Sequence, residues 1–242
     1  MMRHAAYCGT RNIYNDMEIA AKSLIANSSV DVVHFIIEDS EFPRELPDII
    51  KCHDMSGQRF FSSDSPNMRS QFTYMAMMRI ALCHVLKDAD AVLSLDADTV
   101  CVGNVDGIWD LPIDSDYFAA VPEWHRSNDG LQYCNFGVVL YNLANMRDGK
   151  ADECIEVLNK RGYTWVEQDI GNYLCQARIC EMPPEYNANH WTVKNFFELP
   201  SQSRKSIAKI VHYAGIREYR GYDEWREFEN MSWDDVMKMR GA

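Results

Sequence analysis

Apolar and polar residues near the start of the chain follow a pattern that predicts a strand, a helix and a second strand. Residues 4–9 (HAAYCG) and 30–39 (VDVVHFIIED) are short runs that favour buried strands. Between them, apolar residues recur at helical spacing after Asn15, a residue type that favours helix starts. The predicted helical face consists of Met17, Ala20, Ala21, Leu24 and Ile25. This order predicts a parallel βαβ unit and hence an α/β fold.

The same patterns predict further elements along the rest of the chain. Residues 51–66 predict a short strand and then a loop, and residues 67–86 (NMRSQFTYMAMMRIALCHVL) predict one helix that is apolar on most sides and therefore buried. Strands are predicted at 91–98, 117–122, 137–143 and 210–214, and helices near 151–160, 167–177 and 232–240. The chain contains no repeat, low-complexity tract or Gly/Ser linker, so we expect one domain over residues 1–242.

Charge and composition exclude several classes of protein. A net charge of −12 argues against a nucleic-acid-binding groove, and an anionic ligand would therefore need a cation. The opening MMRHAAYCGT lacks the apolar run of a signal peptide, and no apolar stretch is long enough for a transmembrane helix. The eight cysteines form no CxxC motif and mostly occur within apolar patterns, as reduced core thiols do. We therefore expect a soluble, cytoplasmic protein without a zinc site.

The apolar run Leu93 to Leu95 ends in two aspartates, Asp96 and Asp98. Side chains two residues apart in an extended segment point to the same side, so both carboxylates can bind one hard cation such as Mg²⁺ or Mn²⁺. Alternatively, the pair only ends a strand and starts a turn, which is a common role for aspartate. The apolar strand before the pair and the Val and Gly-Asn after it favour the metal site.

Residues 209–215 (KIVHYAG) place His212 in a second apolar run. A lone histidine in such a strand is more often a core residue than a ligand. A metal already bound by two aspartates can nevertheless accept an imidazole, and Gly215 would allow backbone amides to approach a phosphate.

Two other segments place polar side chains where strands and helices begin. In residues 133–143 (YCNFGVVLYNL), Asn135 and Gly137 precede a buried strand, where an amide could bind sugar hydroxyls. In residues 167–174 (EQDIGNYL), the acids Glu167 and Asp169 begin a helix, which is also ordinary helix-start chemistry.

Taken together, these segments resemble glycosyltransferase family 8, a family of retaining transferases. Five blocks occur in the family order between residues 7 and 215: YCGTRNIY, VLSLDADTVCVGNVDGIWDL, YCNFGVVLYNL, EQDIGNYL and IVHYAG. The resemblance implies a GT-A fold, with a mostly parallel, Rossmann-like mixed sheet flanked by helices. It also implies a nucleotide-diphosphate sugar donor, usually UDP-linked, and a Mn²⁺ (or Mg²⁺) cofactor. Residues 1–215 would form the catalytic core and 216–242 an aromatic, amphipathic C-terminal extension.

The resemblance also implies roles for individual residues. The metal ligands would be Asp96, Asp98 and His212, and the nucleoside pocket would contain Cys8, Thr10, Asn12 and Tyr14. Arg79 matches a helix arginine near the donor sugar and phosphate. The sugar hydroxyls would be bound by Asn135, the Phe136 backbone and Glu167. Gln168 would lie beneath the anomeric carbon. Gly215 would lie near the diphosphate.

The chain departs from the family pattern at three places. The family often has Asn-Tyr where this chain has Asn12 and then isoleucine, so that Tyr14 comes one residue late. Phe136 replaces an alanine, and Glu218 occupies the position of a phosphate-binding lysine. Arg217 is the candidate to replace that lysine.

These residues predict a metal-dependent retaining hexosyltransferase that moves glucose or galactose from a UDP-sugar to a glycan, lipid-linked or protein hydroxyl. Because Gln168 is a poor nucleophile, we expect a same-face mechanism in which Gln168 and Glu167 stabilise the cationic sugar and Asp96 and Asp98 hold the metal. One alternative is a sugar-1-phosphate nucleotidylyltransferase, since residues 8–11 (CGTR) resemble that class. Another is a sugar-nucleotide-binding protein without efficient turnover, which Glu218 favours.

Overall fold

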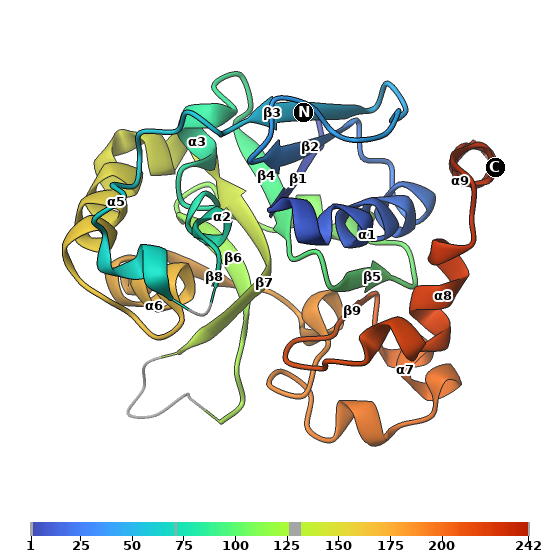
Figure 1. Ribbon diagram of the computed structural model, residues 1–242. Helices are drawn as coiled ribbons and strands as arrows, with labels where there is room; N and C mark the ends of the chain where they lie inside the picture. Colours follow the sequence, from blue (N-terminus) through green and yellow to red (C-terminus); the bar gives the residue numbers. More distant parts are fainter. Residues whose placement is uncertain (1, 71, 126–131, 242) are drawn as a thin grey trace.

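A seven-stranded mixed sheet forms the centre of the protein in a computed structural model that describes residues 2–70, 72–125 and 132–241 (Figure 1). Its strands are β1 (His4–Gly9), β2 (Val32–Ile37), β3 (Ile50–Asp54), β4 (Ala91–Leu95), β6 (Phe118–Pro122), β7 (Cys134–Asn142) and β8 (Ile179–Glu181). Their order is β3-β2-β1-β4-β7-β6-β8. The first four strands in this order are parallel, and β7 runs antiparallel to both β4 and β6.

Helices cover both faces of this sheet (Figure 1). They are α1 (Tyr14–Ala26), α2 (Tyr74–Met77), α3 (Leu82–Val85), α4 (Leu143–Asn145), α5 (Ala151–Lys160), α6 (Val166–Cys175), α7 (Ser201–Ile207), α8 (Asp223–Glu229) and α9 (Trp233–Arg240). One core cluster lies between the sheet and α1, and a second lies between the sheet and the group α2, α3, α5 and α6. This arrangement confirms the expected α/β fold and its mostly parallel mixed sheet.

A separate pair of short strands forms beside the main sheet. Strand β5 (Thr99–Cys101) pairs antiparallel with β9 (Ile210–His212), so Thr99 lies opposite His212. The predicted strand at 210–214 therefore exists, but it pairs with the segment after β4. This pairing joins two parts of the chain that are more than a hundred residues apart in the sequence.

The first predicted helix begins slightly earlier than its sequence signal indicates. Helix α1 starts at Tyr14, and Asn15 lies in its first turn, where its side chain accepts a hydrogen bond from Arg44 and caps nothing. The predicted apolar face is confirmed, because Met17, Ala20, Ala21, Leu24 and Ile25 are all fully buried.

The single helix predicted over residues 67–86 is wrong. The described part of this segment contains a 3₁₀ turn at Pro66–Arg69, the one-turn helices α2 and α3, and turns between them. The side chain of Ser70 bonds both backbone groups of Phe72 and so competes with a helix at this point. Most residues from Met75 to Leu86 are nevertheless buried as expected, whereas Arg69 and Thr73 are exposed. Arg79, expected on a helix, lies in the turn between α2 and α3.

Two further sequence predictions concern cysteines and membrane helices. All eight cysteines are free thiols, and five of them are buried, as expected for reduced core residues. Within the described ranges, the helices are too short or too polar to cross a membrane.

The segment after residue 215 packs on helix α1. The buried carboxylate of Asp16 in α1 accepts hydrogen bonds from the hydroxyl of Tyr219 at 2.9 Å and from Nε of Arg220 at 3.0 Å. Helices α8 and α9 also lie against α1 (Figure 1). This is the packing expected of the tail, while the division of the chain at residue 215 stays a prediction.

The strand directions determine where polar loops meet. The carboxyl ends of β1 and β4 lie at one edge of the sheet because these strands are parallel. Strand β7 is antiparallel to β4, so its first residues lie at that same edge, and the amide of Asp96 bonds the carbonyl of Gly137 at 2.8 Å. Ligands of open α/β sheets bind at this kind of edge.

Candidate active site

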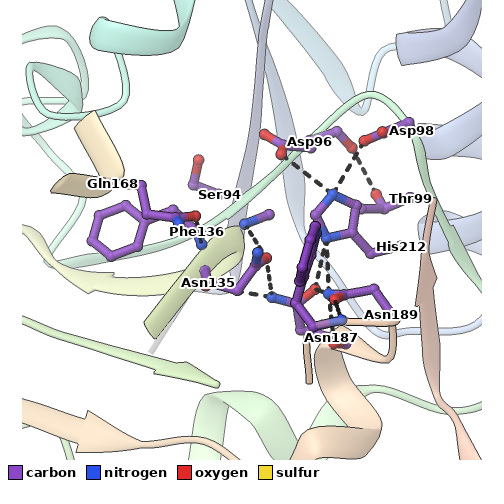
Figure 2. A network of polar contacts seen from close by, with 12 residues as sticks. Ser94, Asp96, Asp98, Thr99, Asn135, Phe136, Gln168, Asn187, Asn189 and His212 are labelled. Carbon is purple, nitrogen blue, oxygen red and sulfur yellow. Dashed lines mark hydrogen bonds and ion pairs between the residues drawn. The ribbon is translucent and has the colours of Figure 1, made fainter. Parts of the chain in front are cut away.

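Asp96, Asp98 and His212 converge just beyond the end of β4. One ligand atom from each residue lies within 4.8 Å of the other two. Nε2 of His212 is 3.5 Å from Oδ2 of Asp96 and 3.4 Å from Oδ1 of Asp98 (Figure 2). The β5–β9 pairing holds this arrangement, since it places Thr99 opposite His212.

The buried ring of His212 is fixed from its other side. Nδ1 lies 2.8 Å from Oδ1 of Asn187 (Figure 2). Because an amide oxygen can only accept, the Nδ1–H group of the ring donates this hydrogen bond. Nε2 then faces the two carboxylates, where its lone pair would be available to a cation bound beside them, which is how a second partner orients a ligand histidine. Burial lowers the pKa of His212, but the carboxylates of Asp98 and Asp96 together outweigh burial and raise it above its usual value.

These three residues fit a divalent cation. Two carboxylates and one imidazole are a mixed oxygen and nitrogen set, which suits Mn²⁺ well and also allows Mg²⁺. The imidazole presents an oriented lone pair, and the aspartate side chains are 39% and 28% exposed, which leaves room for other ligands.

Arg79 links the aspartates to the start of α6. Its guanidinium contacts Asp96 at 2.6 Å and Glu167 at 3.8 Å, and its Nε donates to Ser94 at 3.0 Å. No described residue accepts a hydrogen bond from its buried Nη2. Burial raises the pKa of Glu167 to about 7, although the nearby charge of Arg79 opposes this.

A second polar group surrounds the amide of Gln168. The backbone N–H of Phe136 donates to Oε1 of Gln168 at 2.9 Å (Figure 2), and Nε2 of Gln168 is 3.3 Å from Glu123 and 3.2 Å from the hydroxyl of Tyr133. Asn135 donates to Glu123 at 2.9 Å. The amide of Gln168 is therefore held in one orientation.

A cavity of about 430 Å³ brings most of the predicted residues together. The predicted residues that line it are Cys8, Arg79, Asp96, Asp98, Asn135, Phe136, Glu167, Gln168, His212 and Gly215. Burial raises the pKa of the Cys8 thiol to about 12, so it lines the cavity as an uncharged group.

Four predicted residues do not line this cavity. Thr10 and Asn12 hydrogen-bond each other in the turn after β1. The ring of Tyr14 is 2% exposed, packs on Phe42 and donates its hydroxyl to Asp39, because Tyr14 opens α1 on the core side. Its neighbour Ile13 lines the cavity instead.

Arg217, the fourth of these residues, lines a separate open hollow of about 700 Å³ together with Arg204 and Glu218. Gly215 lines both cavities, and its φ of 74° is in the left-handed region that favours glycine.

Sequence reasoning missed several residues of the site. Glu123, Trp165 and Trp191 line the cavity, Asn187 accepts a hydrogen bond from His212, and Asn189 donates to Oδ1 of Asn187 at 3.1 Å. Glu123 follows the strand predicted at 117–122, as the two aspartates follow theirs, so an acid at a strand end was an available signal. Trp191 and the two asparagines belong to residues 183–200 (PPEYNANHWTVKNFFELP), whose aromatic and amide side chains predict either a sugar-stacking segment or a packed surface loop. Nothing local indicates that Asn187 contacts a histidine 25 residues away.

Comparisons with known proteins show the family of the chain. The family model described as "Glycosyl transferase family 8" matches residues 4–218. A lipopolysaccharide 1,2-glucosyltransferase of Escherichia coli K12 is 27% identical in an alignment of 177 residues, with a coverage of 60% of this chain and 51% of that protein. Glycosyltransferase GlyB of Streptococcus pneumoniae is 22% identical over 185 residues, covering 68% of this chain and 44% of GlyB. The chain thus spans about half the length of these curated relatives.

Solved structures share the fold over nearly the whole chain. Glycosyltransferase GlyE of Streptococcus pneumoniae has a TM-score of 0.72 at 19% identity, covering 98% of this chain and 62% of GlyE. The galactosyltransferase LgtC, solved with donor and acceptor sugar analogues, has a TM-score of 0.65 at 18% identity, covering 98% of this chain and 99% of LgtC. The fold is therefore the GT-A fold, and the chain belongs to glycosyl transferase family 8.

Proposed function

We propose that the protein is a metal-dependent retaining hexosyltransferase that moves glucose or galactose from a UDP-sugar to a hydroxyl acceptor. The observation that carries this proposal is the convergence of Asp96, Asp98 and His212 on the wall of the cavity that also contains Arg79 and Gln168. The family and the named activity of its relatives support it.

The diphosphate end of the donor would lie beside the carboxylate cluster and Arg79. A divalent cation bound there supplies positive charge that stabilises the departing diphosphate. Arg79, which lines the cavity, adds a fixed positive charge near the diphosphate. Cys8 at the end of β1 and Ile13 in the 3₁₀ turn after it would face the nucleoside.

The anomeric carbon would lie near Gln168. The Gln168 amide is held by Phe136 and is not a nucleophile, so it can only stabilise the sugar as positive charge builds. The acceptor hydroxyl attacks the anomeric carbon from the side on which the carbon–oxygen bond to the diphosphate breaks, and its proton passes to the departing phosphate oxygen. Glu167, close to Arg79, would contact the sugar without forming a bond to it.

One panel of measurements tests the proposal. UDP-glucose and UDP-galactose, with and without MnCl₂, should raise the melting temperature only when the cation is present, since a bound donor stabilises the folded state by mass action. The protein should then release UDP, rapidly with an acceptor and slowly with water. NMR of the glycoside product should show the anomeric configuration of the donor.

Other outcomes select the alternatives. Donor binding without UDP release over a long incubation indicates a sugar-nucleotide-binding protein. Release of pyrophosphate from UTP and a sugar-1-phosphate indicates a nucleotidylyltransferase. A covalent adduct at Glu167, trapped with a slow donor, contradicts the same-face mechanism.

A further inference from the structure

Polar side chains fix helix α6 to the beginning of strand β7. Asn172 accepts the backbone N–H of Cys134 at 2.6 Å and donates to the carbonyl of the same residue at 2.8 Å. One turn earlier in α6, Oε1 of Gln168 accepts the N–H of Phe136 at 2.9 Å (Figure 2). Any rotation of this part of α6 would break these bonds, so the wall of the cavity that α6 forms is held in place.

The helix begins with a strained residue shortly before Gln168. Val166 has a φ of 37°, in the left-handed region, where a β-branched residue is a rare outlier. Such strain persists only where the surrounding structure fixes it, and it is typical of functional sites. Here the side chain of Val166 is buried, and the N–H of Trp165 donates to Oδ2 of Asp169 at 2.8 Å. One oxygen of Asp169 therefore fixes the turn from which Gln168 extends.

The other oxygen of Asp169 orients Tyr133, the residue before β7. The hydroxyl of Tyr133 donates to Oδ1 of Asp169. A carboxylate can only accept, so the single hydroxyl proton of Tyr133 points at Asp169 and the oxygen lone pairs remain for other donors. Nε2 of Gln168 donates to this oxygen at 3.2 Å. Tyr133 thus presents an acceptor, and not a donor, to the amide of Gln168.

The contacts of Gln168 determine which end of its amide can meet a ligand. Its Nε2 has two hydrogens and two acceptors, the hydroxyl of Tyr133 at 3.2 Å and Oε1 of Glu123 at 3.3 Å. Its Oε1 accepts one hydrogen bond, from Phe136, and has a second lone pair. The partial negative charge of this oxygen stabilises a sugar carbon that becomes positive, whereas the N–H groups of a reversed amide would oppose that charge.

Tyr133 and Asp169 are absent from the wall of the cavity, although Gln168 and Glu123 belong to it. Their side chains therefore act on a bound donor through Gln168, which they hold from behind. This separates them from the residues that would contact the sugar.

We propose that Tyr133, with its hydroxyl oriented by Asp169, is a positioning residue that keeps Oε1 of Gln168 directed at the anomeric carbon during transfer. This inference rests on the proposed hexosyltransferase function, in which Gln168 lies near that carbon. It gives Asp169 a part in the reaction beyond its hydrogen bond at the start of the helix.

Tyr133→Phe removes the hydroxyl and leaves the ring. Loss of this hydrogen bond should lower kcat roughly three- to tenfold. The KM for the UDP-sugar should change by less than about twofold, because the charge that the amide oxygen stabilises develops only in the transition state. Tyr173→Phe is the matched control, since Tyr173 is 67% exposed on α6 and lies outside the cavity. It should behave like the wild type.

A double-mutant cycle shows whether Tyr133 acts through Gln168. In the Gln168→Ala background, adding Tyr133→Phe should change kcat by less than about twofold, since the amide that the hydroxyl holds is already absent. Equal fold losses in the wild type and in the Gln168→Ala background overturn the proposal.

Asp169→Asn tests the orientation of the hydroxyl. If the asparagine oxygen keeps the N–H of Trp165, its NH₂ group faces Tyr133, and the hydroxyl proton must turn toward Nε2 of Gln168, where two donors then oppose each other. The kcat should therefore fall at least as far as in Tyr133→Phe. Adding Asp169→Asn to Tyr133→Phe should cost less than about twofold. An equal loss in both backgrounds would overturn the role of Asp169.

The amide can also be observed without turnover. In NMR spectra of isotope-labelled protein, the side-chain NH₂ signals of Gln168 are identified by their loss in Gln168→Ala. Tyr133→Phe should move one of the two proton signals upfield and speed its exchange with solvent, whereas Tyr173→Phe should change neither. Unchanged Gln168 signals in Tyr133→Phe overturn the proposal. If the wild type turns over no UDP-sugar while Tyr133→Phe shifts these signals, the proposed function fails and the positioning of the amide stands.

Discussion

The ring of His212 lies directly against the backbone of Gly137, so closely that a Cβ atom at position 137 would be 1.9 Å from Cε1 of His212. No side chain can occupy that space while the histidine keeps its place. Gly137 is therefore required for this approach and not for an unusual backbone conformation, since it is not among the residues with positive φ. This contact connects the beginning of strand β7 to the metal site.

Gly137→Ala should displace His212 and weaken Mn²⁺ binding. Changing the support of a ligand histidine typically costs about 10- to 100-fold in metal affinity. Isothermal titration of the purified protein with MnCl₂ measures the loss. Gly57→Ala is the control, because nothing lies within 4 Å of a Cβ atom at that position. Equal Mn²⁺ affinities for the two variants would refute the assignment of His212 as a ligand.

Asp98→Asn should remove a negative charge from the cation site without altering the shape of the side chain. We expect transfer to fall by roughly two to three orders of magnitude, as when a single stabilising group is removed from a reaction centre. The backbone carbonyl of Asp98 still accepts the N–H of Tyr213, so the circular dichroism spectrum and melting temperature in EDTA should change little. Asp64→Asn, on an exposed loop, is the matched control. Undiminished wild-type activity in EDTA would contradict the metal dependence altogether.

Asn187→Ala should affect both stability and metal binding. Asn187 is fully buried, accepts a hydrogen bond from Nδ1 of His212 and donates one to Oδ1 of Asn135 at 2.9 Å. Leaving a buried partner unsatisfied costs about 1–3 kcal/mol, which urea denaturation in EDTA should detect. Mn²⁺ should then stabilise the variant less than the wild type. Asn230→Ala, on the surface at the end of α8, should behave like the wild type in both measurements. A variant with reduced stability but an unchanged Mn²⁺ response would remove Asn187 from the metal site.

Stability in EDTA should depend on the protonation of Glu167. Its pKa is raised to about 7 by burial, so the folded protein holds this proton more tightly than the unfolded chain, whose glutamate titrates near 4.5. The stabilisation from this proton is complete below the unfolded pKa. It is lost as pH rises through the folded pKa of about 7, and the total loss of unfolding free energy is about 3 kcal/mol. Glu167→Gln should therefore gain stability relative to the wild type between pH 5 and pH 7.5. Parallel curves of unfolding free energy against pH would show that Glu167 does not titrate in this range.

Local patterns predicted much of the fold correctly. The runs at 4–9 and 30–39 became parallel strands, and α1 buries the face that its spacing predicts. These elements depend on periodicity, which neighbouring residues determine. The helix predicted over residues 67–86 was wrong because this segment lacks such a periodicity. A stretch that is apolar on all sides has no pattern that distinguishes a helix from buried turns.

The sequence predicted which residues line the cavity only in part, and the difference between the correct and the incorrect placements has a physical cause. Asp96 and Asp98 were predicted to converge because they would be two residues apart in an extended strand over 91–98, but β4 ends at Leu95 and Asp98 lies in a turn before β5. Their convergence is therefore confirmed, whereas the geometry that produces it is that of the turn and not of a strand. Tyr14 was expected at the nucleoside, but its ring packs on Phe42, and no local signal determines which side of the sheet edge it faces.

The sequence alone determined the alternation of strands and helices, the family and the types of residue at the strand ends, because each is encoded in short stretches of chain. Only the tertiary structure decided that β9 pairs with β5, that His212 lies against Gly137, and that Trp124 and Trp191 meet beside the cavity. Those contacts join segments far apart in the sequence, and they depend on how the whole sheet and its two cores pack.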